Sequence, residues 1–203
     1  MNKKAVIIFT RYPEIGKTKT RLIPAIGAKK AADLQRQMTE KTLLEIEKLN
    51  QLLDIKINIY FSGGNLDLMK AWLGEKYHYY YQIDGDLGLK MYSAFQDTFS
   101  QNNQQIIIIG VDCPQLNYQI LKEAFMALNN HDLVIGKATD GGYYLLGLNQ
   151  LKKDLFININ WGESQVFSQT IIKSKNLNLN IYELPILTDI DRPEDLKFWH
   201  NEI

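Results

Sequence analysis

Short apolar runs alternate with longer amphipathic segments along most of this chain. The runs are rich in β-branched and aromatic residues, which predicts strands. The longer segments carry apolar residues at helical spacing between polar ones, which predicts helices with one buried face. The alternation indicates an α/β fold with helices covering a sheet. The predicted strands span residues 5–10, 55–61, 77–83, 106–109, 133–136, 143–148 and 180–184, and the predicted helices include residues 28–50, 91–99, 120–128 and 163–174 and a short helix ending near residue 72.

One predicted strand ends at a candidate catalytic carboxylate. Residues 106–109 are four consecutive isoleucines, which is typical of a strand buried on both faces in the middle of a sheet. Gly110 and Pro114 then carry the backbone away and leave Asp112 at the carboxyl end of the strand, where open α/β sheets bind ligands. Asp112 is therefore a candidate metal ligand. The alternative is an aspartate that only holds a turn or caps the helix beginning near Asn117.

A cationic loop follows the first predicted strand. It holds four basic side chains and two threonines beside Gly16. Lysine point charges, arginine forks and backbone amides together bind phosphate, so we interpret the loop as a nucleotide phosphate site rather than a solvated basic loop. It is not a P-loop, because that motif needs a glycine where this chain has Arg11. The candidate nucleotide-binding residues are Arg11, Lys17, Lys19 and Arg21.

Two further acidic motifs lie in the second half of the chain. Asp140-Gly141-Gly142 joins two predicted strands, and such a turn is interpreted either as a plain hairpin or as a substrate-facing loop. Asp191 and Glu194, which flank a proline, match a capping box at the start of a helix. Either Asp189 or Asp191 is also a candidate second ligand for a metal held by Asp112.

The composition limits the partners of the protein. Its 203 residues carry 23 Lys and Arg against 23 Asp and Glu, so no net positive field attracts nucleic acid or an anionic membrane. The length fits a single domain over residues 1–203. Cys113 is the only cysteine, which excludes an intrachain disulfide and fits a reducing compartment. The apolar run at residues 5–9 is too short for a signal peptide, so we expect a cytoplasmic protein without a membrane span.

Five short motifs follow one another along the chain. They are Lys19-Thr20-Arg21-Leu22 within residues 9–22, Gly85-Asp86-Leu87-Gly88, Asp112-Cys113-Pro114, Asp140-Gly141-Gly142-Tyr143, and Asp189-Ile190-Asp191 before Pro193-Glu194-Asp195-Leu196. Together they resemble the domain-of-unknown-function 2064 family of bacterial nucleotide-sugar transferases, which includes proteins described as arsenosugar-biosynthesis glycosyltransferases. The resemblance runs nearly end to end. It implies the glycosyltransferase A-type fold, a three-layer α/β/α arrangement around a mixed, Rossmann-like sheet.

The resemblance also implies an activity. It is a metal-dependent transfer of a sugar from a nucleotide-activated donor to a small-molecule acceptor, in which Mg or Mn bridges the diphosphate and neutralises the leaving group. Asp112 would hold the ion with Asp191, because sugar-acid cytidylyltransferases look similar at that motif. Asp112 and Asp140 are the catalytic candidates. Asp86 and Lys90 join the nucleotide-binding candidates, although the family usually has an arginine where Lys90 keeps the charge without the planar fork. The acceptor-binding candidates are Gly141, Gly142 and Tyr143.

Two other activities compete with glycosyl transfer. The runner-up is nucleotidyl transfer, in which a phosphorylated small molecule attacks a nucleoside triphosphate and releases pyrophosphate. Phospholactate guanylyltransferases resemble the chain in a Lys-x-Arg-Leu loop after the first strand, but the glycine-rich, Pro-Lys-terminated loop of many sugar nucleotidyltransferases is absent. A non-catalytic nucleotide-binding protein is the third candidate, which the retained acidic residues disfavour. The identities of nucleotide, sugar and acceptor and the oligomeric state do not follow from the sequence.

Overall fold

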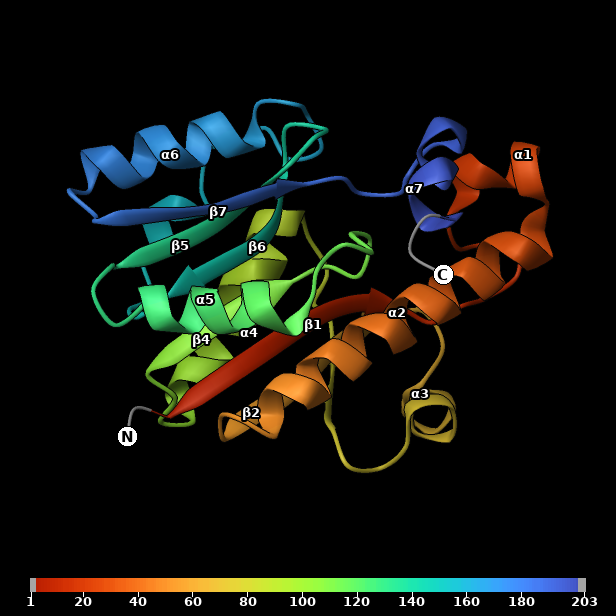
Figure 1. The fold of residues 1–203 in the computed structure, drawn as a ribbon, viewed down its shortest axis with the longest axis horizontal. Coiled ribbons are helices and arrows are strands. Elements are labelled where there is room, and N and C mark those ends of the chain that lie inside the picture. The colour runs from red at the N-terminus through yellow and green to blue at the C-terminus, as the bar shows by residue number, and fades with distance from the viewer. Residues whose placement is uncertain (1–2, 201–203) are drawn as a thin grey trace.

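The computed structural model describes residues 3–200, and strands and helices alternate along them (Figure 1). All seven predicted strands form, with ends shifted by a few residues. The strands are β1 (Lys4–Arg11), β2 (Ile55–Ser62), β3 (His78–Tyr81), β4 (Gln105–Ile109), β5 (Leu133–Ala138), β6 (Tyr143–Leu148) and β7 (Ile181–Leu187). The helices are α1 (Ile23–Ile26), α2 (Ala28–Asn50), α3 (Leu66–Leu73), α4 (Leu87–Ser100), α5 (Tyr118–Ala127), α6 (Val166–Asn176) and α7 (Leu196–His200), with short 3-10 turns η1 (Thr20–Leu22), η2 (Lys153–Leu155) and η3 (Pro193–Asp195).

The strands form one mixed sheet in the order β3-β2-β1-β4-β6-β5-β7. β6 runs antiparallel to its neighbours β4 and β5, and the other pairs are parallel. β1 and β4 lie side by side, with Ile7 opposite Ile108. Because the two strands are parallel, the cationic loop after β1 and Asp112 after β4 meet at the same edge of the sheet.

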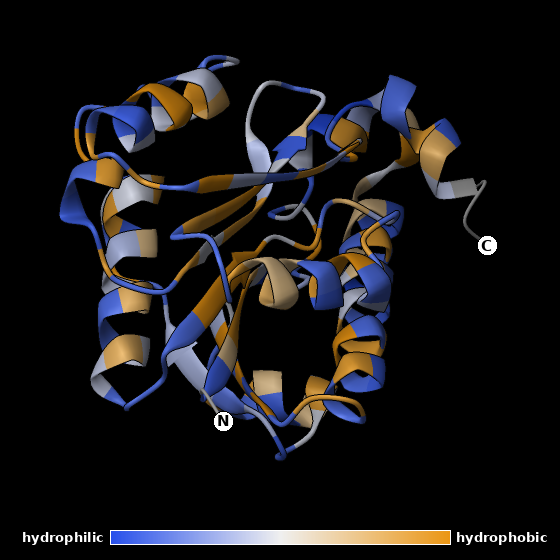
Figure 2. Ribbon diagram, turned by 60° about the vertical axis from the view of Figure 1, so that its left-hand side comes forward, coloured by the Kyte–Doolittle hydropathy of each residue, from blue (hydrophilic) through white to orange (hydrophobic). Residues whose placement is uncertain are grey.

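Two helical layers cover the sheet, because successive side chains of a strand point to opposite faces. Val6 and Ile8 contribute to the core under α2, α3 and α5, whereas Ala5 and Ile7 contribute to the core under α4 and α6. In Figure 2 the central strands are largely orange, while the helices alternate between blue and orange. This arrangement confirms the predicted three-layer fold. Among residues 3–200, no helix combines the length and the apolar character needed to span a bilayer.

The segment after β7 crosses the molecule and packs against its beginning. Figure 1 shows α7 beside α1 and well separated from strand β7. Ile190 and Trp199 are buried against Leu22, Leu34 and Met38. We call residues 188–192 the strap, since they run past the carboxyl ends of the central strands. The strap thereby brings two aspartates to the edge of the sheet that carries Asp112.

The predicted capping box is displaced by one residue. η3 begins after Arg192, so Asp195, not Glu194, falls on the third position. The Asp195 carboxylate accepts the backbone N–H groups of Arg192 at 2.8 Å and Asp191 at 3.2 Å. The prediction of Asp191 as the cap is therefore wrong, because the 3-10 turn starts one residue later than the pattern indicated.

The start of α5 is capped without help from Asp112. The side chain of Asn117 accepts the backbone N–H groups of Gln119 and Ile120, both at 3.1 Å. Asp112 is therefore not the cap of this helix, which was one alternative for its role.

Close contact between β5 and β6 generates a test of the packing. A Cβ placed on Gly136 would lie 2.3 Å from Cζ of the Tyr144 ring. We predict that Gly136→Ala lowers the free energy of unfolding by about 1–3 kcal/mol through overpacking. Urea denaturation measures the difference. Gly110→Ala is the matched control, since a Cβ at Gly110 would meet nothing within 4 Å. Equal losses in the two variants would contradict the packing argument.

Candidate functional site

The loop after β1 is held in place by its own hydrogen bonds. Thr18 is buried, and its hydroxyl donates to the carbonyl of Tyr12 at 3.1 Å and accepts the N–H of Glu14 at 3.2 Å. Arg11 donates from Nη1 to the carbonyl of Lys17 at 2.9 Å. These bonds fix the conformation of the loop, and the exposed side chain of Lys17 pairs with Glu14 at 2.7 Å.

Lys19 turns inward from this loop. Its backbone is left-handed, with φ 48° and ψ 44°, and its ammonium lies 2.8 Å from Oδ1 of Asp112. The ammonium also donates to the carbonyl of Ile190 in the strap at 2.5 Å. The Lys19 side chain is 5% exposed and the Asp112 side chain 47% exposed. A buried ammonium requires an opposite charge, so Lys19 depends on Asp112 while one face of the carboxylate stays open to solvent.

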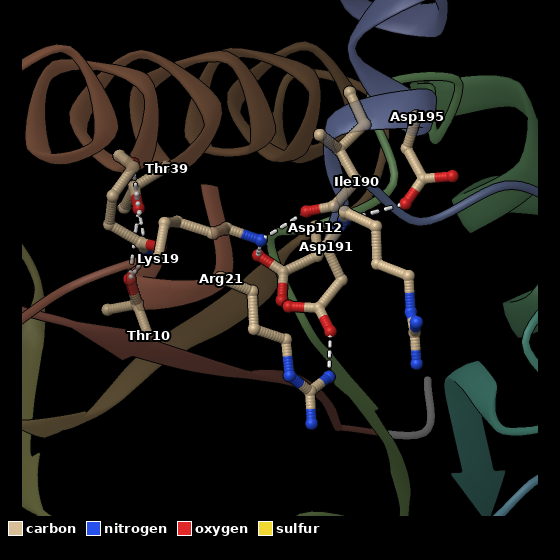
Figure 3. Close-up of polar contacts among 10 residues, drawn as sticks. Thr10, Lys19, Arg21, Thr39, Asp112, Ile190, Asp191 and Asp195 are labelled. Atoms are coloured by element: carbon tan, nitrogen blue, oxygen red, sulfur yellow. Dashed lines mark hydrogen bonds and ion pairs between the residues drawn. The ribbon is translucent and has the colours of Figure 1, made fainter. Parts of the chain in front are cut away.

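A second ion pair lies beside the first. The guanidinium of Arg21 contacts the carboxylate of Asp191; the Arg21 side chain is largely open to solvent and the Asp191 side chain partly so. Figure 3 shows the Asp112 and Asp191 carboxylates next to each other, each with one oxygen joined to a cation of the β1 loop. The strap therefore brings Asp191 to the same cavity as Asp112, and metal binding by the two carboxylates remains a prediction.

A cationic cavity of about 280 Å³ opens between the β1 loop and the two ion pairs. The structure thus brings the four predicted cations of the β1 loop to one place, and their contact with nucleotide remains a prediction. The charged residues that line this cationic cavity are the basic Arg11, Lys17, Lys19 and Arg21 and the acidic Asp112 and Asp191.

Two adjoining cavities, the smaller of which is lined by Asp112, carry the opposite charge. They have volumes of about 300 and 360 Å³ and share Arg21, Asp140, Gly162, Glu163 and Asp189. We call them together the acidic cavities. Five carboxylates line the larger one and the smaller one adds Asp112, so six carboxylates face two arginines. The charged lining residues are Asp112, Asp140, Glu163, Asp189, Asp191, Asp195, Arg21 and Arg192.

Asp140 lies in the hairpin turn between β5 and β6, at the wall of both acidic cavities. Its Oδ1 accepts the N–H of Gly142 at 2.8 Å, so the aspartate does hold its own turn. Gly141 has φ 93°, and a Cβ there would lie 2.0 Å from the carbonyl oxygen of Ser164. The turn is therefore both a hairpin and a cavity wall. At Gly141 its backbone packs directly against the segment before α6.

Asp189 is the carboxylate most affected by its neighbours. Burial raises the pKa of Asp189 to about 6, and repulsion from Asp140 and then Asp112 adds to the shift. The shift marks a place where negative charges crowd together and where a cation would be stabilised. Burial also raises the pKa of the thiol of Cys113, which is buried and not disulfide-bonded.

The acidic residues suit a hard divalent cation. Mg and Mn prefer oxygen ligands, and Mg is commonly held by one or two carboxylates together with substrate phosphates and water. Within the described part of the chain, no three His, Cys, Asp or Glu side chains are arranged to hold a metal ion. Asp112 and Asp191 match the two-carboxylate arrangement, since both line the cationic cavity where phosphate oxygens would complete the ligand set.

Three predicted residues lie at the margin of the site. Asp86 caps α4 by accepting the N–H of Leu89 at 2.8 Å, and Lys90 follows one turn later. Neither side chain lines the three cavities described above. Tyr143 lines only the 300 Å³ cavity, and its hydroxyl lies 3.7 Å from the sulfur of Met91. The roles assigned to these residues remain predictions.

Sequence reasoning missed Trp161 and Glu163. Trp161 had no predicted role and Glu163 was predicted only as the start of a helix over residues 163–174, yet both residues line the 300 Å³ cavity. An aromatic residue and a carboxylate on either side of Gly162, in an otherwise polar segment, were the available signal.

Comparison with known proteins identifies the family. Residues 45–163, more than half of the chain, match the family described as "Uncharacterized protein conserved in bacteria (DUF2064)". The chain belongs to this family. The match confirms the resemblance, and three of the five motifs, at residues 85–88, 112–114 and 140–143, lie within it. No protein with a curated description matches the chain.

Solved structures place this DUF2064 family protein among nucleotide-diphospho-sugar transferase folds. A proposed nucleotide-diphospho-sugar transferase from Desulfovibrio desulfuricans G20 is 34% identical, with a TM-score of 0.88 over 95% of this chain and 84% of the other. The inositol-1-phosphate CTP transferase of T. maritima is 12% identical, with a TM-score of 0.63 over 98% and 95% of the chains. A Mycobacterium tuberculosis H37Rv protein solved with manganese is 12% identical, with a TM-score of 0.62 over the whole of both chains. The last two share the fold alone.

The two ion pairs of the site should differ in strength. Breaking the Lys19–Asp112 pair leaves a buried ammonium without a counter-charge, whereas both partners of the Arg21–Asp191 pair are accessible to solvent. A double-mutant cycle with Lys19→Met and Asp112→Asn should give a coupling of about 1–3 kcal/mol. The cycle with Arg21→Ala and Asp191→Asn is the control and should give about 0–1 kcal/mol. Chemical denaturation measures both, and a coupling for the buried pair no larger than the control would contradict the assignment.

Proposed function

We propose that this protein transfers a sugar from a nucleotide diphosphate donor to a hydroxyl of a small acceptor. The observation that supports this is the division of charge on the two sides of Asp112. A diphosphate is drawn to the cationic cavity. A hydroxyl that must lose its proton is suited to the acidic cavities, where carboxylates can accept it. The sugar being transferred would lie between the two, next to Asp112.

The donor would be bound by the β1 loop. Arg21 offers a planar fork and Lys17 an exposed point charge, and both suit diphosphate oxygens. Lys19 already donates to Asp112 and to the strap, so its main proposed role is to hold Asp112 in place rather than to bind phosphate. Asp112 and Asp191 would hold Mg or Mn, and the bound ion supplies neutralisation of the diphosphate leaving group.

The acceptor would be activated by Asp140. Its Oδ1 is engaged by the N–H of Gly142, which orients the carboxylate and leaves Oδ2 to accept a proton from a hydroxyl. Gly142 has no side chain to obstruct the approach, and it lines the same cavity. Asp140 therefore combines a fixed orientation with an open position.

Nucleotidyl transfer remains the second candidate because of one observation. Arg21 and Arg192 both line the 360 Å³ cavity, where they could bind the phosphate of a second substrate. The five carboxylates that line the same cavity oppose such an anion. The charge balance of the cavity therefore favours glycosyl transfer.

Ligand-dependent thermal stability distinguishes the two reactions. We predict that one nucleotide sugar, screened with Mg or Mn, stabilises the protein by about 2.7 kcal/mol at a hundredfold excess over its dissociation constant. Asp112→Asn should remove the metal-dependent part of this gain, because it removes a ligand of the ion. Stabilisation by a nucleoside triphosphate but by no nucleotide sugar would favour nucleotidyl transfer instead.

Asp140 should affect turnover more than donor binding. General-base catalysis contributes about 10²–10⁴-fold to a rate, so Asp140→Asn should lower turnover by at least the lower value. Donor affinity, measured by calorimetry, should stay nearly unchanged, because Asp140 lies outside the cationic cavity. A collapse of donor binding with preserved turnover at saturating donor would show that Asp140 belongs to the nucleotide or metal site.

A further inference from the structure

Trp161 is fixed on two sides. A Cβ on Gly88, in the first turn of α4, would lie 2.3 Å from the indole Nε1, so the helix backbone approaches the indole as closely as glycine allows. The ring of Tyr143 meets the indole edge-on, with centroids 6.4 Å apart and planes at 82°. An aromatic ring held in this way presents its remaining surface in one orientation.

That remaining surface borders the 300 Å³ cavity, next to Leu87 and Val166. Glu163 lines the same cavity two residues later. Gly162 between them has φ 87°, a conformation that side-chain-bearing residues rarely adopt. The turn at Gly162 thus lets an aromatic ring and a carboxylate serve one cavity.

An apolar wall opposite several carboxylates selects a particular chemistry. The C–H faces of a sugar-like ring or polyol lie favourably against an indole, and its hydroxyls donate to carboxylates, which only accept. A phosphate or carboxylate on the same molecule would face Asp140, Glu163 and Asp189, and like charges placed together cost affinity. The cavity therefore discriminates by charge as well as by shape.

We propose that Trp161 is the platform of the acceptor site, and that the site takes a polyhydroxyl compound without phosphate or carboxylate groups, with Glu163 enforcing that choice. The inference rests on the proposed glycosyl transfer and adds the chemical class of the acceptor. Trp161 acts as a positioning residue and Glu163 as a specificity-determining one.

Tryptophan fluorescence tests the platform without requiring turnover. The probes are glucose, glucosamine and glycerol, compared with glucose 6-phosphate, glucuronate and glycerol phosphate, in the presence of Mg and a nucleoside diphosphate. At least one of the three non-acidic probes should give a saturable fluorescence change in the native protein that disappears in Trp161→Phe. Its acidic counterpart should have a dissociation constant at least about tenfold higher, because a charged cleft changes the local concentration of a charged ligand by about 10–10³-fold. The proposal is overturned if none of the non-acidic probes changes the fluorescence, or if the acidic probes bind more tightly.

Charge reversal tests the role of Glu163. Glu163→Lys should remove most of the discrimination against the acidic probes, because it replaces a negative charge at the cavity wall with a positive one. The position is exposed, so the fold should tolerate a lysine. Asp154→Lys is the matched control: it makes the same charge change at an exposed position in η2, outside the acidic cavities. Equal effects of the two variants would reduce Glu163 to a contribution to net charge and overturn its assignment.

Nucleotide binding separates this inference from the proposed function. Calorimetry with the nucleoside diphosphate and Mg should give the same affinity in the native protein, Trp161→Phe and Glu163→Lys. Absence of nucleotide binding in the native protein would contradict the proposed function. Intact nucleotide binding without a polyol response would contradict the acceptor assignment alone.

Discussion

The buried ammonium of Lys19 joins three segments that are far apart in the sequence. It reaches from the β1 loop to the carboxylate of Asp112 after β4 and to the carbonyl of Ile190 in the strap. The N–H of Ile190 in turn donates to the carbonyl of Asp112 at 2.8 Å. Because the ammonium has little contact with solvent, none of the three segments can move away without leaving a charge unpaired. The positions of Asp189 and Asp191 depend on this junction.

The junction also separates most charges of the site. Asp112 and Arg21 line both the cationic cavity and the 300 Å³ cavity. Of the three cavities, Lys17 and Lys19 line only the cationic one, and Asp140, Glu163 and Asp189 line only the acidic ones, whereas Asp191 of the strap lines the cationic and the 360 Å³ cavity. The fold alone does not specify a reaction, since it is shared with enzymes that are only 12% identical. Glycosyl transfer is therefore inferred from the charges that line each cavity and not from the sheet that carries them.

The parts of the fold and site that follow from local patterns could be predicted from the sequence. The four isoleucines of β4 indicated a buried strand, and the glycine and proline after it placed Asp112 at the edge of the sheet. The grouping of Arg11, Lys17, Lys19 and Arg21 in one loop is also local. The inward turn of Lys19 was not predictable, because it depends on a strap more than 160 residues away. Trp161 and Glu163 were missed for the same reason, since glycines in other segments determine where their loop packs.

The position of a diphosphate and its metal tests the charge division most directly. A crystal structure with Mn and a nucleoside diphosphate would locate the ion by its anomalous signal and the phosphates by their density. The account predicts manganese in contact with Asp112 and the diphosphate in the cationic cavity beside Lys17 and Arg21, with the cavity at Trp161 left to the acceptor. A diphosphate in the cavity lined by Trp161 and Glu163 would contradict it.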